Sequence, residues 1–207
     1  MIKYVTKRER KIANSRAIKI VKDLQNYLSP KYKIDPKLVG SGRYNAVVCD
    51  DNGVYDMDYQ LILTNNCKCE IFDANVIRKD FLNAFNKIKN ENERVENSTS
   101  VITIRVSNNK GNFNGKNEQF SFDFAIIIEN DDGSFITRRD DENHYVWNKL
   151  PSKNSDIYKK FYSLKYDKQK VIIEKVINRK IKEKAKPKEQ RISSSIIFME
   201  EVNNYRG

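Results

Sequence analysis

Three aspartates lie in apolar stretches of the sequence, where a carboxylate is expensive to bury. Asp56 and Asp58 fall in the segment YDMDY (55–59), and Asp123 falls in QFSFDFAIII (119–128). Both segments read as buried strands, and a carboxylate there needs a cation, a metal ion or a proton to offset its lost hydration. Side chains alternate along a strand, so Asp56 and Asp58 share one face. If the two strands are neighbours, all three carboxylates meet on one patch of the sheet.

Neither segment contains a lysine or an arginine, so the neutralising group must come from elsewhere. A basic residue from another part of the chain is one candidate. Magnesium is the other, because Mg²⁺ takes hard oxygen ligands and leaves positions open for water and substrate phosphates. Two such ions a few ångströms apart can activate an attacking hydroxyl and stabilise a leaving pyrophosphate. The aspartates therefore predict a Mg²⁺ (or Mn²⁺) site.

A corner of small residues, VGSGR (39–43), precedes the first pair of aspartates. Gly40 permits close approach of the backbone and Ser41 adds a hydroxyl, and N–H groups at a following helix start can cradle phosphate oxygens. The stretch is not a P-loop, which needs G-x-x-x-x-G-K-[ST]. It is not a dinucleotide fingerprint either, because Asn45 stands where the third glycine belongs. We interpret it as a phosphate-binding corner, with an ordinary turn as the alternative.

The elements that must position these residues follow from the spacing of apolar side chains. The pattern predicts an α+β (α/β) fold with a mixed β-sheet, flanking helices and a small C-terminal helical layer. We expect a core with its N-terminal helix in residues 1–150 and a helical segment packed on it in residues 151–207. The expected helices are 6–28, 43–49, 73–89, 155–165, 168–185 and 193–204, and the expected strands are 37–39, 54–63, 100–107, 119–128 and 135–138.

The length of 207 residues suits one domain, or one domain with a small appendage. No apolar run approaches the roughly 20 residues of a membrane span. The N-terminus lacks the apolar stretch of a signal peptide, so we expect a cytoplasmic protein without a membrane partner. Three cysteines and one histidine argue against a zinc site, which needs about four ligands. Nothing in the sequence indicates the oligomeric state.

The net charge of +11 is unevenly distributed. Residues 1–33 hold ten Lys/Arg and two acidic residues, and residues 151–207 hold fifteen and seven, whereas residues 34–150 hold fourteen and nineteen. A basic surface favours polyanions. The two basic ends therefore make NTP substrates the expected partners and RNA or DNA a further candidate, with a merely solvated charged face as the alternative.

The combination of motifs is more specific than any one of them. The corner VGS (39–41), the strand YDMDY (55–59) and the later FDF (122–124) follow one another at spacings that resemble the DNA polymerase β nucleotidyltransferase superfamily. The resemblance covers roughly residues 35–130 and implies a polymerase β-like nucleotidyltransferase core.

The resemblance also implies roles for the motif residues. In that superfamily three carboxylates hold two Mg²⁺ ions, which would make Asp56, Asp58 and Asp123 both the catalytic and the metal-binding residues. Gly40 and Ser41 would hold the triphosphate of the donor nucleotide. Asp123 would also help to deprotonate the acceptor hydroxyl.

Within the superfamily, the long first helix and the trailing helices look most like the branch of cyclic GMP-AMP synthase and oligoadenylate synthase, with its bacterial cyclic-oligonucleotide synthases. Members often carry a serine-rich corner before a late helix and a lysine on the preceding helix, both contacting the donor nucleotide. RISSSIIFMEEV (191–202) resembles the corner, with Ser194 as the best match. QKVIIEKVINRK (169–180) resembles the helix, with Lys175 as the lysine. A plain N-cap serine and a solvated lysine are the alternatives.

The function implied by this resemblance is a Mg²⁺-dependent nucleotidyltransferase, which moves an NMP from an NTP to a hydroxyl and releases pyrophosphate. Another nucleotide is the favoured acceptor, giving an oligonucleotide or cyclic nucleotide second messenger of the kind used in antiviral defence. Transfer to tRNA, protein or a small molecule is one alternative, and a non-catalytic nucleic-acid-binding relative is another. The chain is short for a cyclase of this kind, and base preference and product linkage stay open.

Overall fold

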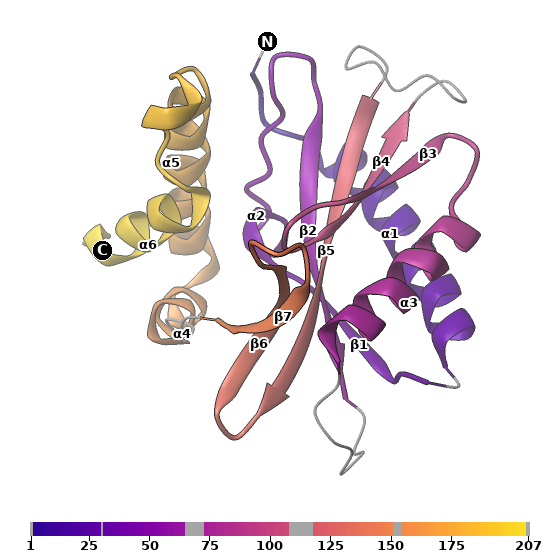
Figure 1. The fold of residues 1–207 in the computed structure, drawn as a ribbon. Coiled ribbons are helices and arrows are strands. Elements are labelled where there is room, and N and C mark those ends of the chain that lie inside the picture. Colours follow the sequence, from indigo (N-terminus) through magenta and orange to yellow (C-terminus); the bar gives the residue numbers. More distant parts are fainter. Residues whose placement is uncertain (1, 30, 65–72, 108–117, 151–154, 206–207) are drawn as a thin grey trace.

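The computed structural model describes residues 2–29, 31–64, 73–107, 118–150 and 155–205. It shows one mixed sheet of seven strands, with helices α1 and α3 on one side and α4–α6 on the other (Figure 1). The strands are β1 Ile34–Leu38, β2 Tyr55–Leu63, β3 Glu93–Asn97, β4 Ile102–Ser107, β5 Glu118–Asn130, β6 Gly133–Arg139 and β7 Tyr145–Lys149. The helices are α1 Lys7–Leu28, α2 Gly40–Arg43, α3 Ala74–Ile88, α4 Ser155–Ser163, α5 Tyr166–Lys184 and α6 Ser194–Asn204, with a short 3₁₀ turn at Lys188–Gln190.

The sheet places the two aspartate-bearing strands side by side at its centre. Its order is β1-β2-β5-β4-β3, and β6 pairs with the end of β5 and with β7. The strands β2 and β5 are parallel, and every other pairing in the sheet is antiparallel. Parallel neighbours need a crossover connection, and here it includes α3 together with β3 and β4.

One face of the sheet carries the main hydrophobic core. Met57 and Tyr59 of β2, together with Phe122 and Phe124 of β5, are buried in one cluster with apolar residues of α1 and α3. Helix α1 begins with a capping box, in which the side chains of Thr6 and Glu9 each accept a hydrogen bond from the other's backbone N–H. This fixes where the helix starts and hence which way its apolar stripe faces. Because side chains alternate along a strand, packing these residues against α1 and α3 turns the intervening aspartates to the opposite face.

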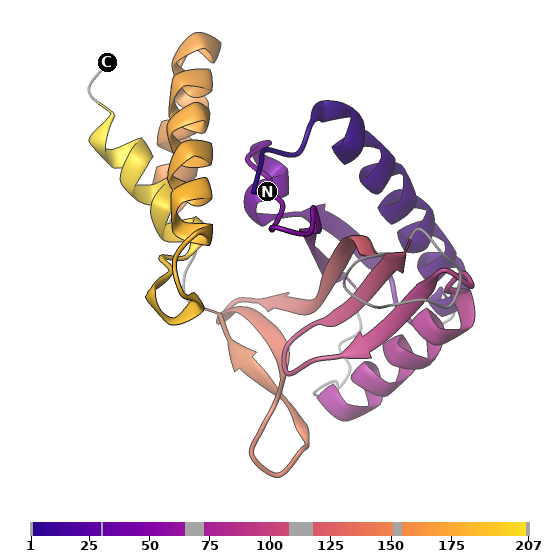
Figure 2. The same ribbon diagram turned by 90° about the horizontal axis from the view of Figure 1, so that it is seen from above.

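The helices α4–α6 form a second layer with a hydrophobic cluster of their own (Figure 2). Two residues that follow α2 belong to this cluster, since Tyr44 and Ala46 are buried in it. The Tyr44 ring stacks on Phe198 of α6 with ring centroids 4.2 Å apart. The chain between α2 and β2 thus joins the helical layer to the sheet.

The structure corrects two boundaries near the Gly-Ser corner. The strand expected at 37–39 begins earlier, so that β1 runs through Pro36. A proline is tolerated there because β1 pairs only with β2 and lies at the sheet edge. The prediction of a helix at 43–49 is wrong. The helical turn lies earlier, in α2, and Asn45 after it has a left-handed φ of 62°, which an α-helix does not continue through.

Two strands were not predicted from the sequence, β3 and β7. Both carry polar residues among the apolar ones, and both lie at the ends of the strand order. Such strands show little alternation, so the sequence gives no clear signal for them. The described helices include none that is long and apolar enough to span a membrane.

Candidate active site

The register of β2 against β5 brings the predicted carboxylates together. Asp58 lies directly opposite Asp123 in the parallel pair, and Asp56 lies opposite Ser121. The three carboxylates therefore share the face that points away from α1 and α3. The sequence predicted this cluster on the condition that the strands were neighbours, and that condition is met.

Two hydroxyl groups orient the carboxylates. Ser121 Oγ on β5 donates a hydrogen bond to Asp56 Oδ1 across the parallel pair. Thr103 Oγ1 on β4 donates one to Asp123 Oδ1 at 2.6 Å. Each aspartate so held keeps a second carboxylate oxygen for another ligand, since a carboxylate has about four acceptor positions.

The electrostatics of the patch disfavour negative charge. Burial raises the pKa of Asp58 to about 6, and the carboxylates of Asp123 and Asp56 act in the same direction. Burial also raises the pKa of Asp123, against the hydrogen bond from Thr103. Lys180 opposes the rise at Asp58, but burial and like charges outweigh it. Burial therefore disfavours the charged form of both Asp58 and Asp123.

Gly40 lies against the carboxylate of Asp58. Its φ is +57°, in the left-handed region, and a Cβ added to it would stand 2.5 Å from Asp58 Oδ2. The N–H of Val39 also donates to the Asp58 carbonyl at 2.9 Å. The neighbouring Ser41 lies in α2, and its carbonyl accepts a hydrogen bond from the Ala46 N–H at 2.9 Å. Within this corner, the backbone of Gly40 is therefore the part that lies against the Asp58 carboxylate.

We expect Gly40→Ala to lower the free energy of unfolding by at least about 1 kcal/mol more than Gly53→Ala. Both glycines have positive φ, and a left-handed alanine costs roughly 1–2 kcal/mol. At Gly53 nothing lies within 4 Å of an added Cβ, whereas at Gly40 the added Cβ meets Asp58. Urea unfolding of the two variants measures the difference, and equal losses would show that the contact with Asp58 is unimportant.

Sequence reasoning missed Lys180 on α5. It is only 5% exposed, and its Nζ donates to the Ala46 carbonyl at 2.6 Å. Lys184, one turn later, donates to the Val48 carbonyl at 2.9 Å. These two lysines attach α5 to the chain that follows the Gly-Ser corner, and Lys180 is the cation whose charge reaches Asp58.

The stability of the protein is expected to rise between about pH 8 and pH 10 through Lys180. Burial lowers the pKa of Lys180 from 10.5 to about 8, the charge of Lys184 lowers it further, and Asp58 opposes both. In that pH range the unfolded chain binds more protons than the folded one, so the free energy of unfolding increases, by up to about 3 kcal/mol. Urea unfolding of wild type and Lys180→Met at pH 7.5 and pH 10 checks this. Parallel pH dependence in both proteins would contradict it.

Within the described part of the chain, the two residues predicted in the helical layer, Lys175 and Ser194, form no hydrogen bond or ion pair with the carboxylates or with the segment that Lys180 binds. Lys175 is exposed on α5, with its Nζ 5.8 Å from the centre of the Tyr205 ring. Ser194 is the first residue of α6, and the capping hydroxyl is that of Ser193, which accepts from the Ile196 N–H. Neither lines the cavities described below, and their assignment as nucleotide-binding residues stays a prediction.

The donor set of the patch suits a hard divalent cation. Three carboxylates on one face offer the oxygen ligands that Mg²⁺ and Mn²⁺ prefer. Within the described ranges, no three His, Cys, Asp or Glu side chains are already drawn together as a metal site. The fit therefore rests on the shared face, the Asp58–Asp123 register and the raised pKa values.

A cavity of about 810 Å³ adjoins the corner and is lined by Gly40. Gln60, two positions after Asp58 on the same face of β2, also lines it, and Tyr158 of α4 provides an aromatic wall. The guanidinium carbon of Arg43 lies 5.2 Å from the centre of the Tyr158 ring. The cavity combines cations with aromatic surface beside Gly40, the residue that lies against Asp58. Its size and chemistry suit a nucleotide.

Comparison with solved structures reveals the same fold in bacterial cyclic dinucleotide synthases. No family model and no curated protein matches the sequence. The Vibrio cholerae DncV cyclic AMP-GMP synthase in complex with nonhydrolyzable GTP matches with a TM-score of 0.60 and 12% identity, over 89% of this chain and 49% of that one. CdnC of Escherichia coli MS115-1 with ATP matches with a TM-score of 0.56 and 14% identity, over 97% and 62%.

A third match is the CdnE cyclic dinucleotide synthase of Elizabethkingia meningoseptica with GTP and Apcpp, with a TM-score of 0.57 and 14% identity over 92% of this chain and 68% of that one. This chain therefore has the fold of these synthase structures, as the motif resemblance predicted. This chain spans about half the length of the DncV structure it matches.

Proposed function

We propose that this protein is a metal-dependent nucleotidyltransferase that transfers an NMP from an NTP to a hydroxyl of another nucleotide and so forms an oligonucleotide or a cyclic nucleotide. The observation that carries the proposal is the pairing of Asp58 with Asp123 on parallel strands, with Gly40 against the Asp58 carboxylate. Support for the substrate class comes from the matched synthases, whose structures hold GTP, ATP or their analogues.

In this proposal each element of the site has one role. Asp56 and Asp58 would hold Mg²⁺ or Mn²⁺, and Asp123 would complete the ligand set. The cations would supply charge neutralisation for the phosphates. The backbone of Gly40 and Ser41 contacts the donor triphosphate. Asp123, oriented by Thr103, accepts the proton of the attacking hydroxyl. The new bond joins that oxygen to the α-phosphorus, and the bond to the leaving pyrophosphate breaks.

We add Lys180 to the predicted Lys175 as a candidate for the cation nearest the reacting phosphates. Lys180 is buried, and its charge acts on Asp58, whereas Lys175 lies over the ring of Tyr205. Phosphate transfer depends mainly on positioning and charge stabilisation, so a fixed lysine beside the carboxylates has more effect there than an exposed one.

A tRNA, protein or small-molecule acceptor would use the same carboxylates, and a nucleic-acid-binding module would use the two basic ends without turnover.

The test is incubation of the purified protein with the four labelled NTPs, singly and mixed, with Mg²⁺ or Mn²⁺. Products are separated by chromatography and identified by mass. A dinucleotide or longer product with pyrophosphate release, absent in Asp56→Asn/Asp58→Asn, supports the proposal. Binding of NTP without any product under all conditions would contradict a nucleotide acceptor.

A further inference from the structure

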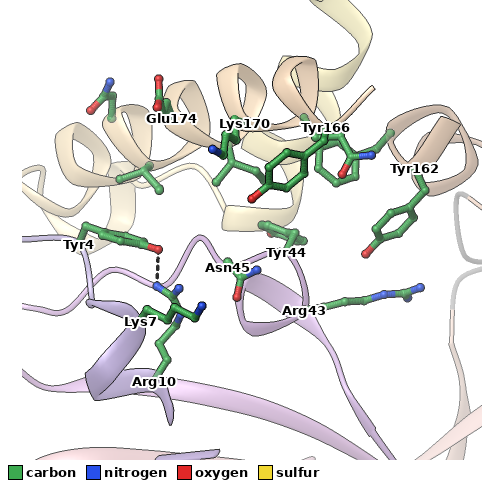
Figure 3. Close-up of a pocket in the computed structure, with 15 residues that line it drawn as sticks. Tyr4, Lys7, Arg10, Arg43, Tyr44, Asn45, Tyr162, Tyr166, Lys170 and Glu174 are labelled. Carbon is green, nitrogen blue, oxygen red and sulfur yellow. Dashed lines mark hydrogen bonds between the residues drawn. The ribbon is translucent and has the colours of Figure 1, made fainter. Parts of the chain in front are cut away.

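A second cavity has a volume of about 860 Å³. Neither cavity has any of the three carboxylates in its lining, but the first includes Gly40, which lies against Asp58, and the second does not. The second cavity lies between α5 and the start of the chain (Figure 3). Arg43 at the end of α2 and the next two residues, Tyr44 and Asn45, form its floor. Tyr4, Lys7 and Arg10 face it from the N-terminal side, and Tyr166 and Lys170 face it from α5. Residues far apart in sequence thus form two opposed walls.

Both walls combine aromatic rings with cations. The Arg10 guanidinium lies 4.9 Å from the centre of the Tyr4 ring and donates to the Val5 carbonyl at 2.5 Å. Across the cavity, the Lys170 ammonium lies 4.8 Å from the centre of the Tyr166 ring. In such cation–π contacts the positive charge is attracted to the aromatic ring. Each wall therefore offers a stacking surface with a positive charge beside it.

The positive charge of the cavity lining favours a negatively charged ligand. Lys7, Arg10, Arg43 and Lys170 line it, against Glu174 as the one acidic residue in the lining. A cavity lined by one sign of charge concentrates counter-ions of the opposite sign, and aromatic walls favour planar rings. The chemistry that matches both is a planar ring that carries a phosphate or carboxylate.

The floor of this cavity connects it to the carboxylates. Tyr44 lines it, stacks on Phe198, and has its pKa raised by burial and then by nearby charges that include Asp58. Asn45, also in the lining, has a φ of 62° and precedes Ala46, the residue whose carbonyl Lys180 binds. An occupant in contact with Tyr44 therefore touches the segment that joins the helical layer to the Gly-Ser corner.

We propose that this cavity is a second ligand site, separate from the carboxylate site, that binds a small planar anion of the mononucleotide type between the Tyr4–Arg10 wall and the Tyr166–Lys170 wall. The two cavities share Arg43 and Tyr162 in their linings, so a test must use residues that belong to one cavity only. Lys170 lines the second cavity alone, and Lys159 of α4 lines the first alone.

The experiment is equilibrium dialysis of labelled AMP against the full chain carrying Asp56→Asn and Asp58→Asn, without divalent cations. In this background we expect Lys170→Glu to weaken AMP binding at least about tenfold, the loss that follows when one charge-assisted hydrogen bond is removed. Lys159→Glu and Lys182→Glu, the latter an exposed residue of α5 outside both linings, are the matched charge reversals. We expect each to change affinity less than about twofold. Thermal unfolding confirms that all variants are folded.

Two outcomes would overturn the proposal. If Lys159→Glu weakens AMP binding and Lys170→Glu does not, the mononucleotide occupies the cavity beside Gly40. If AMP does not bind and only long RNA or DNA does, with Lys170→Glu weakening it, the basic walls belong to a polynucleotide surface. The result does not depend on turnover, so failure of the proposed enzymatic function and failure of this site are distinguishable.

Discussion

Asp58→Asn is expected to reduce NTP-dependent pyrophosphate release on the order of 10²–10³-fold while leaving the protein folded. A loss of this size is typical when one preorganised group that stabilises charge in the transition state is removed. Asp58 lies opposite Asp123 in the register and against Gly40, at the centre of the proposed site. Asparagine keeps the shape of the side chain and removes its charge.

The same substitution is expected to leave the melting temperature unchanged or raise it when no metal is present. Burial and the neighbouring carboxylates raise the pKa of Asp58 to about 6, above its ordinary value near 4. At pH 7 the folded state therefore carries a charge that it disfavours relative to the unfolded chain, and asparagine removes that cost. A loss of activity with a large fall in melting temperature would mean that Asp58 is a structural residue.

The matched control for this experiment is Asp131→Asn. Asp131 is exposed between β5 and β6, and the substitution makes the same change of one charge. We expect turnover and melting temperature to stay within error of the wild type. If Asp131→Asn lowered turnover as much as Asp58→Asn, the effect would reflect net charge and not the carboxylate site.

Arg78→Met is expected to lower the free energy of unfolding by about 3–5 kcal/mol, because several buried acceptors lose their donor at once. Arg78 on α3 is 1% exposed. Its guanidinium donates to Asn97 Oδ1 at 2.9 Å, to Thr137 Oγ1 at 3.3 Å and to the Ser98 carbonyl at 2.8 Å. Burial lowers its pKa to about 10, so it stays charged at neutral pH.

The reason for so large an effect is that methionine fills the space but donates no hydrogen bond. Each acceptor left buried without a partner costs about 1–3 kcal/mol, and these acceptors join α3 to β3, to the turn after β3 and to β6. Urea unfolding measures the loss. Lys79→Met is the control, because Lys79 is the next residue of α3 and is exposed; it is expected to change stability by less than about 0.5 kcal/mol. Similar losses in both variants would contradict the role of the buried network.

Local sequence patterns determined most of the elements and the chemistry of the carboxylates. Alternation along β2 alone places Asp56 and Asp58 on one face, because side-chain direction has a period of two in any strand. The boundaries of α1 and α3 follow from capping residues, Thr6 and Asp73, that satisfy free N–H groups at the helix start. These signals act over a few residues and need no knowledge of the rest of the fold.

Only the tertiary structure decided which strands are neighbours and which lysine reaches the site. The pairing of Asp58 with Asp123 joins residues across a crossover whose length and path no local pattern specifies. On α5 the buried face continues from Ile172 and Val176 to Lys180, although lysine is ordinarily exposed. Lys175 stands about 140° away around the helix. A buried lysine looks like a solvated one in sequence, because its burial depends on a carbonyl and a carboxylate that folding brings to it.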